Sequence, residues 1–199
     1  FMLTPFLLSL LCRSYALLLD ELPVPGNILI PMSVDLRGRA GIARDAVFFN
    51  QWSLQPLLIP RELCVNPEAV FAELKGQIFE NMSEQLPQAF RAASRLGRIA
   101  PFPFLMSLVN KTKRTGCGTF MYSFLSESSL KSGEFCGHRI LNLYHIPSMP
   151  PVTGAGVFMN SFGGALNVTL SYREDSLTPN AVRSRFISSF VSALPKEAQ

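Results

Sequence analysis

Apolar residues recur at helical spacing in three parts of the chain. Residues 1–20 are apolar on nearly every side and Thr4-Pro5 is a typical first turn, so we expect a buried helix there. Asn66-Pro67 predicts the start of a second helix, with an apolar stripe on one side and charged residues opposite. A last helix is expected after Thr178-Pro179, with apolar positions at Val182, Phe186, Phe190 and Leu194.

Five other segments are rich in branched and aromatic residues, which is typical of β-strands or extended chain. They are Ile28 to Leu36, Val47 to Ile59, Thr119 to Leu125, His138 to Ile146 and Ala165 to Tyr172. In the last of these, apolar and polar residues alternate, which predicts a strand with one covered face.

Two more helical segments are expected between these strands. Pro87 should break the helix that follows Asn66, a short helix should run to about Leu96, and Pro101 leads into an apolar stretch that ends at Lys113. The resulting order is one helix, two strands, two or three helices, at least three strands and one helix. This order predicts an α/β fold in which a mixed β-sheet is flanked by helices. We find no repeat and no linker, so residues 1–199 are expected to form one domain.

The composition adds an excess of apolar residues to this picture. Of the 199 residues, 48% are hydrophobic and only 16% are charged, whereas globular domains carry about 25% charged residues. These values exclude disordered, collagen-like and coiled-coil chains. Arg13 and the lack of a basic start argue against a membrane-spanning or signal segment in residues 1–20. The apolar excess must therefore be covered by a partner or by a missing piece of the same protein.

Motifs of several chemistries are missing from the sequence. We find no G-x-S-x-G elbow, no H-E-x-x-H zinc motif and no complete phosphate-binding loop. The cysteines lack C-x-x-C spacing, so no metal site is expected, and thiols without a signal peptide favour the cytoplasm. These cysteines are Cys12, Cys64, Cys117 and Cys136.

The chain has only two histidines. His138 follows a glycine and is expected at a turn or on the surface. His145 shares one face of a predicted strand with Leu141 and Leu143, which favours a structural role over that of a general base. No carboxylate is spaced to pair with either histidine, so the chain lacks most of what an acid–base enzyme needs.

Four segments carry a resemblance when they are taken in order. They are IPMSVDLR at Ile30–Arg37, VFFNQ at Val47–Gln51, TFMYS at Thr119–Ser123 and GALNVTLSYRED at Gly164–Asp175. With the helices around them, they resemble the C-terminal half of the chloramphenicol acetyltransferase-like superfamily. This superfamily includes condensation domains of nonribosomal peptide synthetases and wax ester synthase/diacylglycerol acyltransferases.

The resemblance implies that the chain is one half of a pseudo-dimer. The catalytic histidine of an H-H-x-x-x-D motif would lie on the N-terminal half, and no such motif occurs in this sequence. The implied reaction is the attack of an alcohol or amine on a thioester of coenzyme A or a carrier protein, which serves as substrate rather than as a tightly bound cofactor. The alternative is a non-catalytic module that binds or docks an acyl carrier protein or a partner subunit.

Three residues match functional positions of that superfamily. Ser123 matches a serine that donates a hydrogen bond to the tetrahedral intermediate in some members. Asn50 matches an asparagine near the tunnel between the halves, and Arg37 matches an arginine that supports the site by pairing with a carboxylate. For Asn50 and Arg37, a structural role is favoured over direct contact with substrate.

A basic segment stands apart from the resemblance. No acidic residue occurs between Glu84 and Glu127, and six basic residues lie in that interval: Arg91, Arg95, Arg98, Lys111, Lys113 and Arg114. Such a patch suits an acidic carrier protein, the phosphates of coenzyme A or an anionic membrane surface, although a solvated basic face is the favoured interpretation. Nucleic acid is disfavoured because no aromatic residues alternate with the basic ones.

The resemblance also accounts for the apolar excess. A half-protein exposes the surface that its other half covers, so this chain is expected to pair with the missing N-terminal half or with a second copy of itself.

Overall fold

The computed structural model describes residues 2–17, 27–38, 51–115, 119–125, 133–147, 155–172 and 180–195, with the side chains of residues 96, 108, 109, 111–115 and 180–182 excepted. The helices are α1 (Leu3–Ala16), α2 (Pro67–Ser83), α3 (Leu86–Leu96), α4 (Phe102–Thr115) and α5 (Asn180–Ala193), with a short 3-10 turn at Arg61–Val65. The strands are β1 (Asn27–Asp35), β2 (Trp52–Pro60), β3 (Phe120–Leu125), β4 (Glu134–Phe135), β5 (His138–Arg139), β6 (Ala155–Phe162) and β7 (Ala165–Tyr172).

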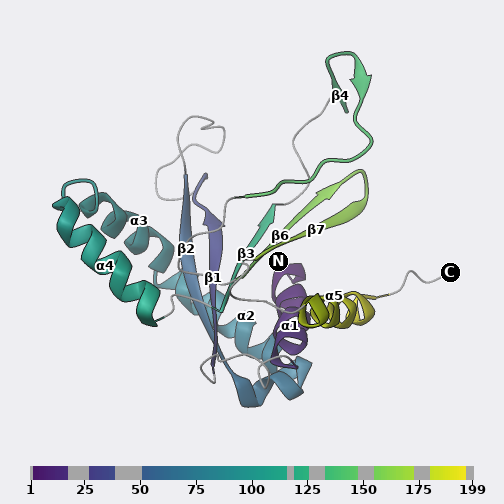
Figure 1. Cartoon of the computed structure of the whole chain (residues 1–199), viewed down its shortest axis with the longest axis horizontal. Coiled ribbons are helices and arrows are strands. Elements are labelled where there is room, and N and C mark those ends of the chain that lie inside the picture. Colours follow the sequence, from purple (N-terminus) through teal and green to yellow (C-terminus); the bar gives the residue numbers. More distant parts are fainter. Residues whose placement is uncertain are drawn as a thin grey trace.

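Five strands form one mixed sheet in the order β2-β1-β3-β6-β7. Strands β1, β3 and β6 run parallel in its centre, and each edge strand is antiparallel to its neighbour. Strands β4 and β5 form a separate small ribbon that projects away from the sheet (Figure 1). The predicted α/β class with a mixed sheet and flanking helices is therefore confirmed.

Helices α1, α2 and α5 cover one face of the sheet and enclose the hydrophobic core with it (Figure 1). Leu7, Leu8 and Leu11 of α1 are fully buried, as expected for a helix that is apolar on nearly every side. The helix begins at Leu3, however, so Thr4 is not its cap. Thr4 instead hydrogen-bonds the buried hydroxyl of Tyr122 on β3.

The predicted start of α2 is confirmed. The Asn66 side chain accepts hydrogen bonds from the backbone N–H groups of Glu68 and Ala69, at 3.1 and 3.3 Å. Further along α2, the Gln77 side chain accepts from the N–H of Leu58 and donates to its carbonyl, at 2.9 and 2.7 Å. This helix therefore satisfies backbone groups of the edge strand β2, which would otherwise be open to pairing with another chain.

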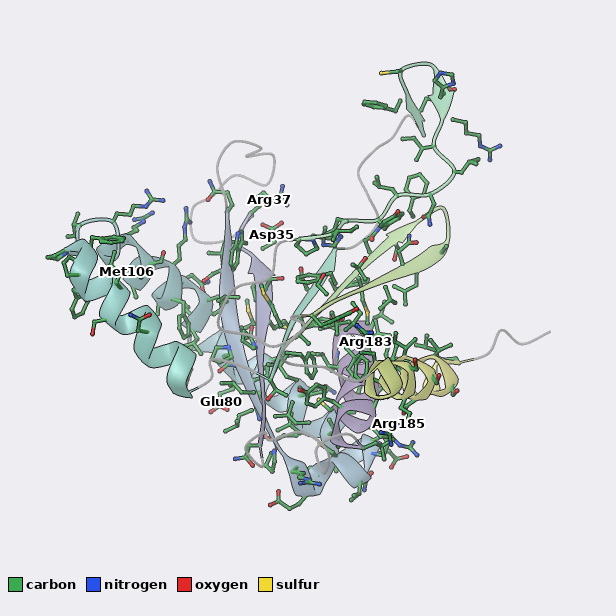
Figure 2. The ribbon with its side chains drawn as sticks, viewed as in Figure 1. Asp35, Arg37, Glu80, Met106, Arg183 and Arg185 are labelled. Atoms are coloured by element: carbon green, nitrogen blue, oxygen red, sulfur yellow. The ribbon has the colours of Figure 1, made fainter. Side chains whose placement is uncertain are left out.

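Helix α3 packs beside β2, and α4 lies outside α3, at the end of the molecule opposite α5 (Figure 1). The break before α3 occurs at Gln85, which has a left-handed backbone with φ of 56°, and Pro87 sits in the first turn of α3. The apolar stretch after Pro101 forms helix α4. Phe102, Phe104 and Met106 on α4 are exposed, and Figure 2 shows Met106 on this outlying helix.

Two strand predictions need correction. Strand β6 was not predicted at all, yet Ala155 to Asn160 are buried without interruption and pair with both β3 and β7. A strand buried on both faces does not alternate, which explains why periodicity missed it. The predicted strand from His138 to Ile146 is wrong: only His138–Arg139 pair, in the β4–β5 ribbon, and Leu141 and Ile146 are 86% and 72% exposed.

The other predicted elements are present, but the covered face expected for β7 is not, since its apolar residues Leu166, Val168 and Tyr172 are 38%, 41% and 36% exposed. Strands β1, β3 and β7 match their predictions within one residue, and β2 matches from Trp52 onward, while residues 47–50 lie outside the described residues. The Phe186 and Phe190 side chains of α5 are buried in the core, whereas Thr178 and Pro179 lie outside the described residues. Among the described residues, we find no helix that is both long and apolar enough to span a membrane.

Replacement of a core leucine tests the helix layer. Leu11 is 0% exposed at the centre of the core, and Leu11→Ala should lower the free energy of unfolding by about 2–5 kcal/mol because it leaves a cavity. Urea unfolding measures this loss. Leu3→Ala in the same helix is the control, since Leu3 is 47% exposed and should lose far less. Equal losses for the two variants would contradict the assignment of Leu11 to the core.

The buried Cys64 and Tyr15 side chains predict a loss of stability in alkali. Burial raises the pKa of Cys64 from 9.0 to about 11 and that of Tyr15 from 10.0 to about 12. A raised pKa means that the folded chain keeps a proton that the unfolded chain loses, so stability declines as pH rises from about 9 towards 12. The urea midpoint should therefore fall over this range. Cys64→Ala should reduce the fall between pH 9 and 11, and an identical profile would refute the role of this thiol.

Candidate functional site

The central strands β1 and β3 separate at their carboxyl ends. Their register is fixed at one pair, Met32 with Tyr122. Before this pair, Thr119 holds the strands together: its N–H donates to the Leu29 carbonyl at 2.7 Å, and its hydroxyl accepts from the Leu29 N–H at 3.0 Å. The chain leaves β1 towards β2, and β3 lies next to β6 on the opposite side. A sheet opens a crevice where neighbouring parallel strands connect in opposite directions, and ligands bind there.

A pocket of about 540 Å³ occupies this opening, and we call it the β1/β3 pocket. Its walls come from the ends of β1 and β2, from β3 and β6, and from the segment that precedes β6. The lining residues are Ser33, Val34, Asp35, Arg37, Gln51, Trp52, Met121, Ser123, Phe124, Leu125, His145, Pro147 and Phe158. The pocket therefore combines an apolar wall with a few polar groups, as small-molecule sites do.

Ser123 lies in this pocket, as does Ser33, which sequence analysis did not single out. The Ser33 hydroxyl donates to the Ser123 Oγ at 2.7 Å across the opening between the strands. We find no other hydrogen-bond partner for the Ser123 hydroxyl in the part of the chain that the structure describes. A hydroxyl that already accepts still has its own hydrogen to donate. Ser123 can therefore donate to an oxygen of a bound ligand.

Arg37 lies at the end of β1 and pairs with a carboxylate. Its Nη2 is 2.7 Å from Oδ2 of Asp35, and its Nε lies 3.0 and 2.9 Å from the two carboxylate oxygens. Figure 2 shows both side chains together at this end of the strand. The hydrogen bond and the negative charge of Asp35 raise the pKa of Arg37. Because the pair is about half exposed, at 44% and 52%, it orients groups at the rim of the pocket more than it stabilises the fold.

Asn50 lies outside the described residues, but its neighbour Gln51 lines the pocket. The Gln51 side-chain oxygen accepts a hydrogen bond of 2.7 Å from Nη2 of Arg91 on α3. Gln51 thus links the β1/β3 pocket to the basic segment of the sequence.

Part of the basic segment lines a second pocket of about 600 Å³ between α3 and β2, which we call the α3 pocket. Arg91, Arg95 and Arg98 share this pocket with Trp52 and other residues, although Arg98 lies just beyond the helix. The side chains of Lys111, Lys113 and Arg114 lie outside the described residues. The described half of the patch is a concave basic surface with an aromatic floor.

His145 does not lie on a strand face with Leu141 and Leu143. It sits on an extended segment and packs edge-to-face against Phe158 of β6, with 5.9 Å between the ring centroids. Its side chain lines the β1/β3 pocket, and its buried Nδ1 has no hydrogen-bond partner among the described residues. This placement could have been found only through strand β6, which carries Phe158, and that strand was not predicted.

A smaller pocket of about 230 Å³ lies on the core side of the same opening and shares Ser33, Val34, Asp35 and Phe124 with the β1/β3 pocket. Gln55 lines it, and the buried side-chain oxygen of this residue has no hydrogen-bond partner in the described chain. The junction of β1 and β3 is therefore hollow on both faces of the sheet.

The described cysteines do not line the β1/β3 pocket. Cys12 and Cys64 are buried in the core, and Cys136 is exposed on the turn between β4 and β5. Burial raises the pKa of Cys12 well above its usual range. The described residues contain no group of three or more His, Cys, Asp or Glu side chains arranged to hold a metal ion.

The sequence matches no protein-family profile and no curated protein. Solved structures nevertheless share its fold. The structure of a condensation domain that mediates chain release from the enacyloxin polyketide synthase matches with a TM-score of 0.60 and 14% sequence identity, over 99% of this chain and 38% of its own.

Two further structures match at similar levels. The trichothecene 15-O-acetyltransferase from Fusarium sporotrichioides has a TM-score of 0.55 and 15% identity, over 95% of this chain and 40% of its own. The epimerization domain from the third module of tyrocidine synthetase B has a TM-score of 0.53 and 11% identity, over 95% of this chain and 40% of its own.

These matches confirm the expected fold. The chain shares its fold with these condensation, epimerization and acetyltransferase structures and spans about 40% of their length. That share agrees with the half-domain expected from the sequence.

Proposed function

We propose that the chain is the C-terminal half of an acyltransferase or condensation enzyme. An acyl group passes from a thioester, carried by coenzyme A or a carrier protein, to an alcohol or amine. The N-terminal half supplies the histidine that acts as general base, and this chain supplies one wall of the site. The observation that carries the proposal is the β1/β3 pocket, which contains Ser123, in a chain whose fold spans about 40% of condensation and acetyltransferase structures.

The residues of the pocket suit the role that we propose for this chain in acyl transfer. When the alcohol or amine attacks, negative charge develops on the thioester oxygen, and a hydroxyl aimed at that oxygen stabilises it. Ser123 is held for this task by Ser33, and Arg37 with Asp35 orders the adjacent turn. The apolar wall formed by Met121 and Phe158 suits the acyl chain.

The exposed side of the sheet supports the partner half. Trp52, Leu58 and Leu125 project from the face opposite the helix layer and are 45%, 47% and 50% exposed. Trp52 and Leu125 also line the β1/β3 pocket, and exposed apolar surface beside a pocket suits an interface. The N-terminal half of the same protein fits this face, and a second copy of the chain is the alternative occupant.

Free thiols at Cys12 and Cys64 support a reducing compartment such as the cytoplasm.

The coding sequence upstream of Phe1 tests the proposal. It should encode an H-H-x-x-x-D motif about half a domain before Phe1. The longer protein should then transfer acyl groups from acyl-coenzyme A to members of a panel of alcohols and amines. Thiol release and product mass measure the transfer. Absence of both the motif and the transfer would favour the non-catalytic docking module.

In that longer protein, Ser123→Ala should lower kcat on the order of 10²-fold, because it removes one donor to the developing negative charge. Arg37→Lys should also lower kcat, since lysine cannot reproduce the bidentate pairing with Asp35. Ser83→Ala and Arg13→Lys, which lie on the surface of the helix layer, are the matched controls. Full activity of both Ser123→Ala and Arg37→Lys would remove these residues from the site.

We further propose that the α3 pocket receives the phosphates of coenzyme A or of a carrier protein's phosphopantetheine. Its three arginines are charge-complementary to phosphate, and Trp52 offers a flat apolar contact. Arg95→Glu should weaken coenzyme A binding by about tenfold, measured by calorimetry at fixed salt, because a donor is replaced by a repelling charge. The control is Arg13→Glu on α1. Unchanged binding would identify the patch as a solvated basic face.

A further inference from the structure

His145 is a polar residue of the β1/β3 pocket to which the proposed function gives no role. The segment that carries it is fixed two residues earlier, where the Leu143 carbonyl accepts hydrogen bonds from Asn160 and Asn167, at 2.6 and 3.2 Å. On its other side, the imidazole packs against the buried ring of Phe158. The ring is therefore held in place at the pocket wall before any ligand arrives.

The surroundings of Nδ1 decide which nitrogen carries hydrogen. In a neutral imidazole one ring nitrogen is a donor and the other an acceptor. Nδ1 is buried and has no partner among the described residues, so a hydrogen placed there would be a buried donor with no acceptor. With the hydrogen on Nε2, Nδ1 is instead a buried acceptor, and the one hydrogen of the neutral ring lies on the nitrogen that can reach the pocket. Because the side chain lines the pocket and Nδ1 is buried, Nε2 is the nitrogen that can meet a ligand.

Ser123 lies on the same side of the sheet. It pairs in register with Phe158, the residue whose ring contacts His145, so the hydroxyl and the imidazole flank one aromatic ring. Both groups then present a hydrogen to the pocket. Two hydrogen-bond donors on one wall fit a ligand that presents a hydrogen-bond acceptor to that wall.

The charged residues of the pocket indicate which chemical group this acceptor belongs to. The described charged groups that line it are Asp35 and Arg37, which are already paired with each other. The site therefore has no unbalanced charge that would select a carboxylate or an ammonium group. Its apolar wall, which includes Met121 and Phe124, favours a neutral oxygen attached to a hydrocarbon chain, as in the carbonyl of an acyl group.

We propose that Nε2 of His145 donates a hydrogen bond to the carbonyl oxygen of the acyl group bound in the β1/β3 pocket, beside the hydroxyl of Ser123. The proposal rests on the proposed function, because it takes an acyl thioester as the ligand. It adds a substrate-binding residue on this chain and asks for no proton transfer from the imidazole.

The position of the ring hydrogen can be tested without a ligand. With only two histidines in the chain, ¹⁵N labelling of histidine gives two imidazole spectra, and exposed His138 on β5 serves as the internal reference. His145→Gln assigns the signals. We expect His145 to carry its hydrogen on Nε2. A hydrogen found on Nδ1 of His145 would overturn the proposal whatever ligand the pocket takes.

The carbonyl contact is tested with two probes that differ in one oxygen. S-octanoyl pantetheine is an acyl thioester, and S-octyl pantetheine is the thioether that lacks the carbonyl. The full 199-residue chain should bind the thioester about three- to tenfold more tightly, the worth of one hydrogen bond. Binding should shift the ring signals of His145 and leave those of His138 unchanged.

Three variants assign this preference to the imidazole. His145→Phe keeps a ring against Phe158 and should weaken the preference for the thioester to what Ser123 alone provides, while His145→Gln, which retains a donor, should keep more of it. His138→Phe is the matched control and should leave the preference unchanged. Circular dichroism and thermal unfolding confirm that each variant is folded.

The outcomes separate this proposal from the one on which it rests. If both probes bind equally, or if His145→Phe keeps the full preference, the hydrogen bond from His145 is refuted while an acyl-pantetheine pocket stands. If neither probe binds, the acyl thioester is not a ligand of this pocket, and the proposal for His145 falls together with this part of the proposed function.

Discussion

The junction of β1 and β3 is the constraint on which the rest of the structure depends. It joins two parallel strands that are far apart in the sequence, and only the Met32–Tyr122 pair fixes their register. Thr119 fastens the strands on one side of that pair, and the Ser33–Ser123 hydrogen bond spans the other side, where they diverge. Had the strands paired along their full length, backbone ladders would fill the space that the β1/β3 pocket occupies. The incomplete pairing thus creates the site.

The helix layer makes such a junction possible. Helices α1, α2 and α5 pack on one face of the sheet, and Tyr122 sits at 0% exposure in that core with its hydroxyl hydrogen-bonded to Thr4. The core therefore holds the central strands from one side, so the other side does not have to close. The opposite face carries the pocket and some of the exposed apolar residues, among them Trp52, Leu58 and Leu125.

Much of the fold could be predicted from local patterns. The cap at Asn66, the apolar surface of α1 and the alternation in β7 are encoded within one or two helical turns or one strand, and the structure contains each of these elements. The errors also have a local cause. Strand β6 is buried on both faces and shows no alternation, while the segment from His138 to Ile146 has the composition of a strand but gains no partner beyond a two-residue ribbon.

The sequence by itself determined the fold class, the order of its elements, and two residues of the pocket, Ser123 and Arg37. Periodicity, caps and ordered motifs are properties of neighbouring residues, so they can be recognised in the sequence without knowledge of the tertiary structure. Only the tertiary structure brought Ser33 to Ser123, which are 90 positions apart, and placed His145 against Phe158 beside them. These contacts depend on which strands become neighbours and where they diverge. That choice is made by packing of the sheet on its helices, because hydrophobic burial rewards contact between surfaces irrespective of their distance in sequence.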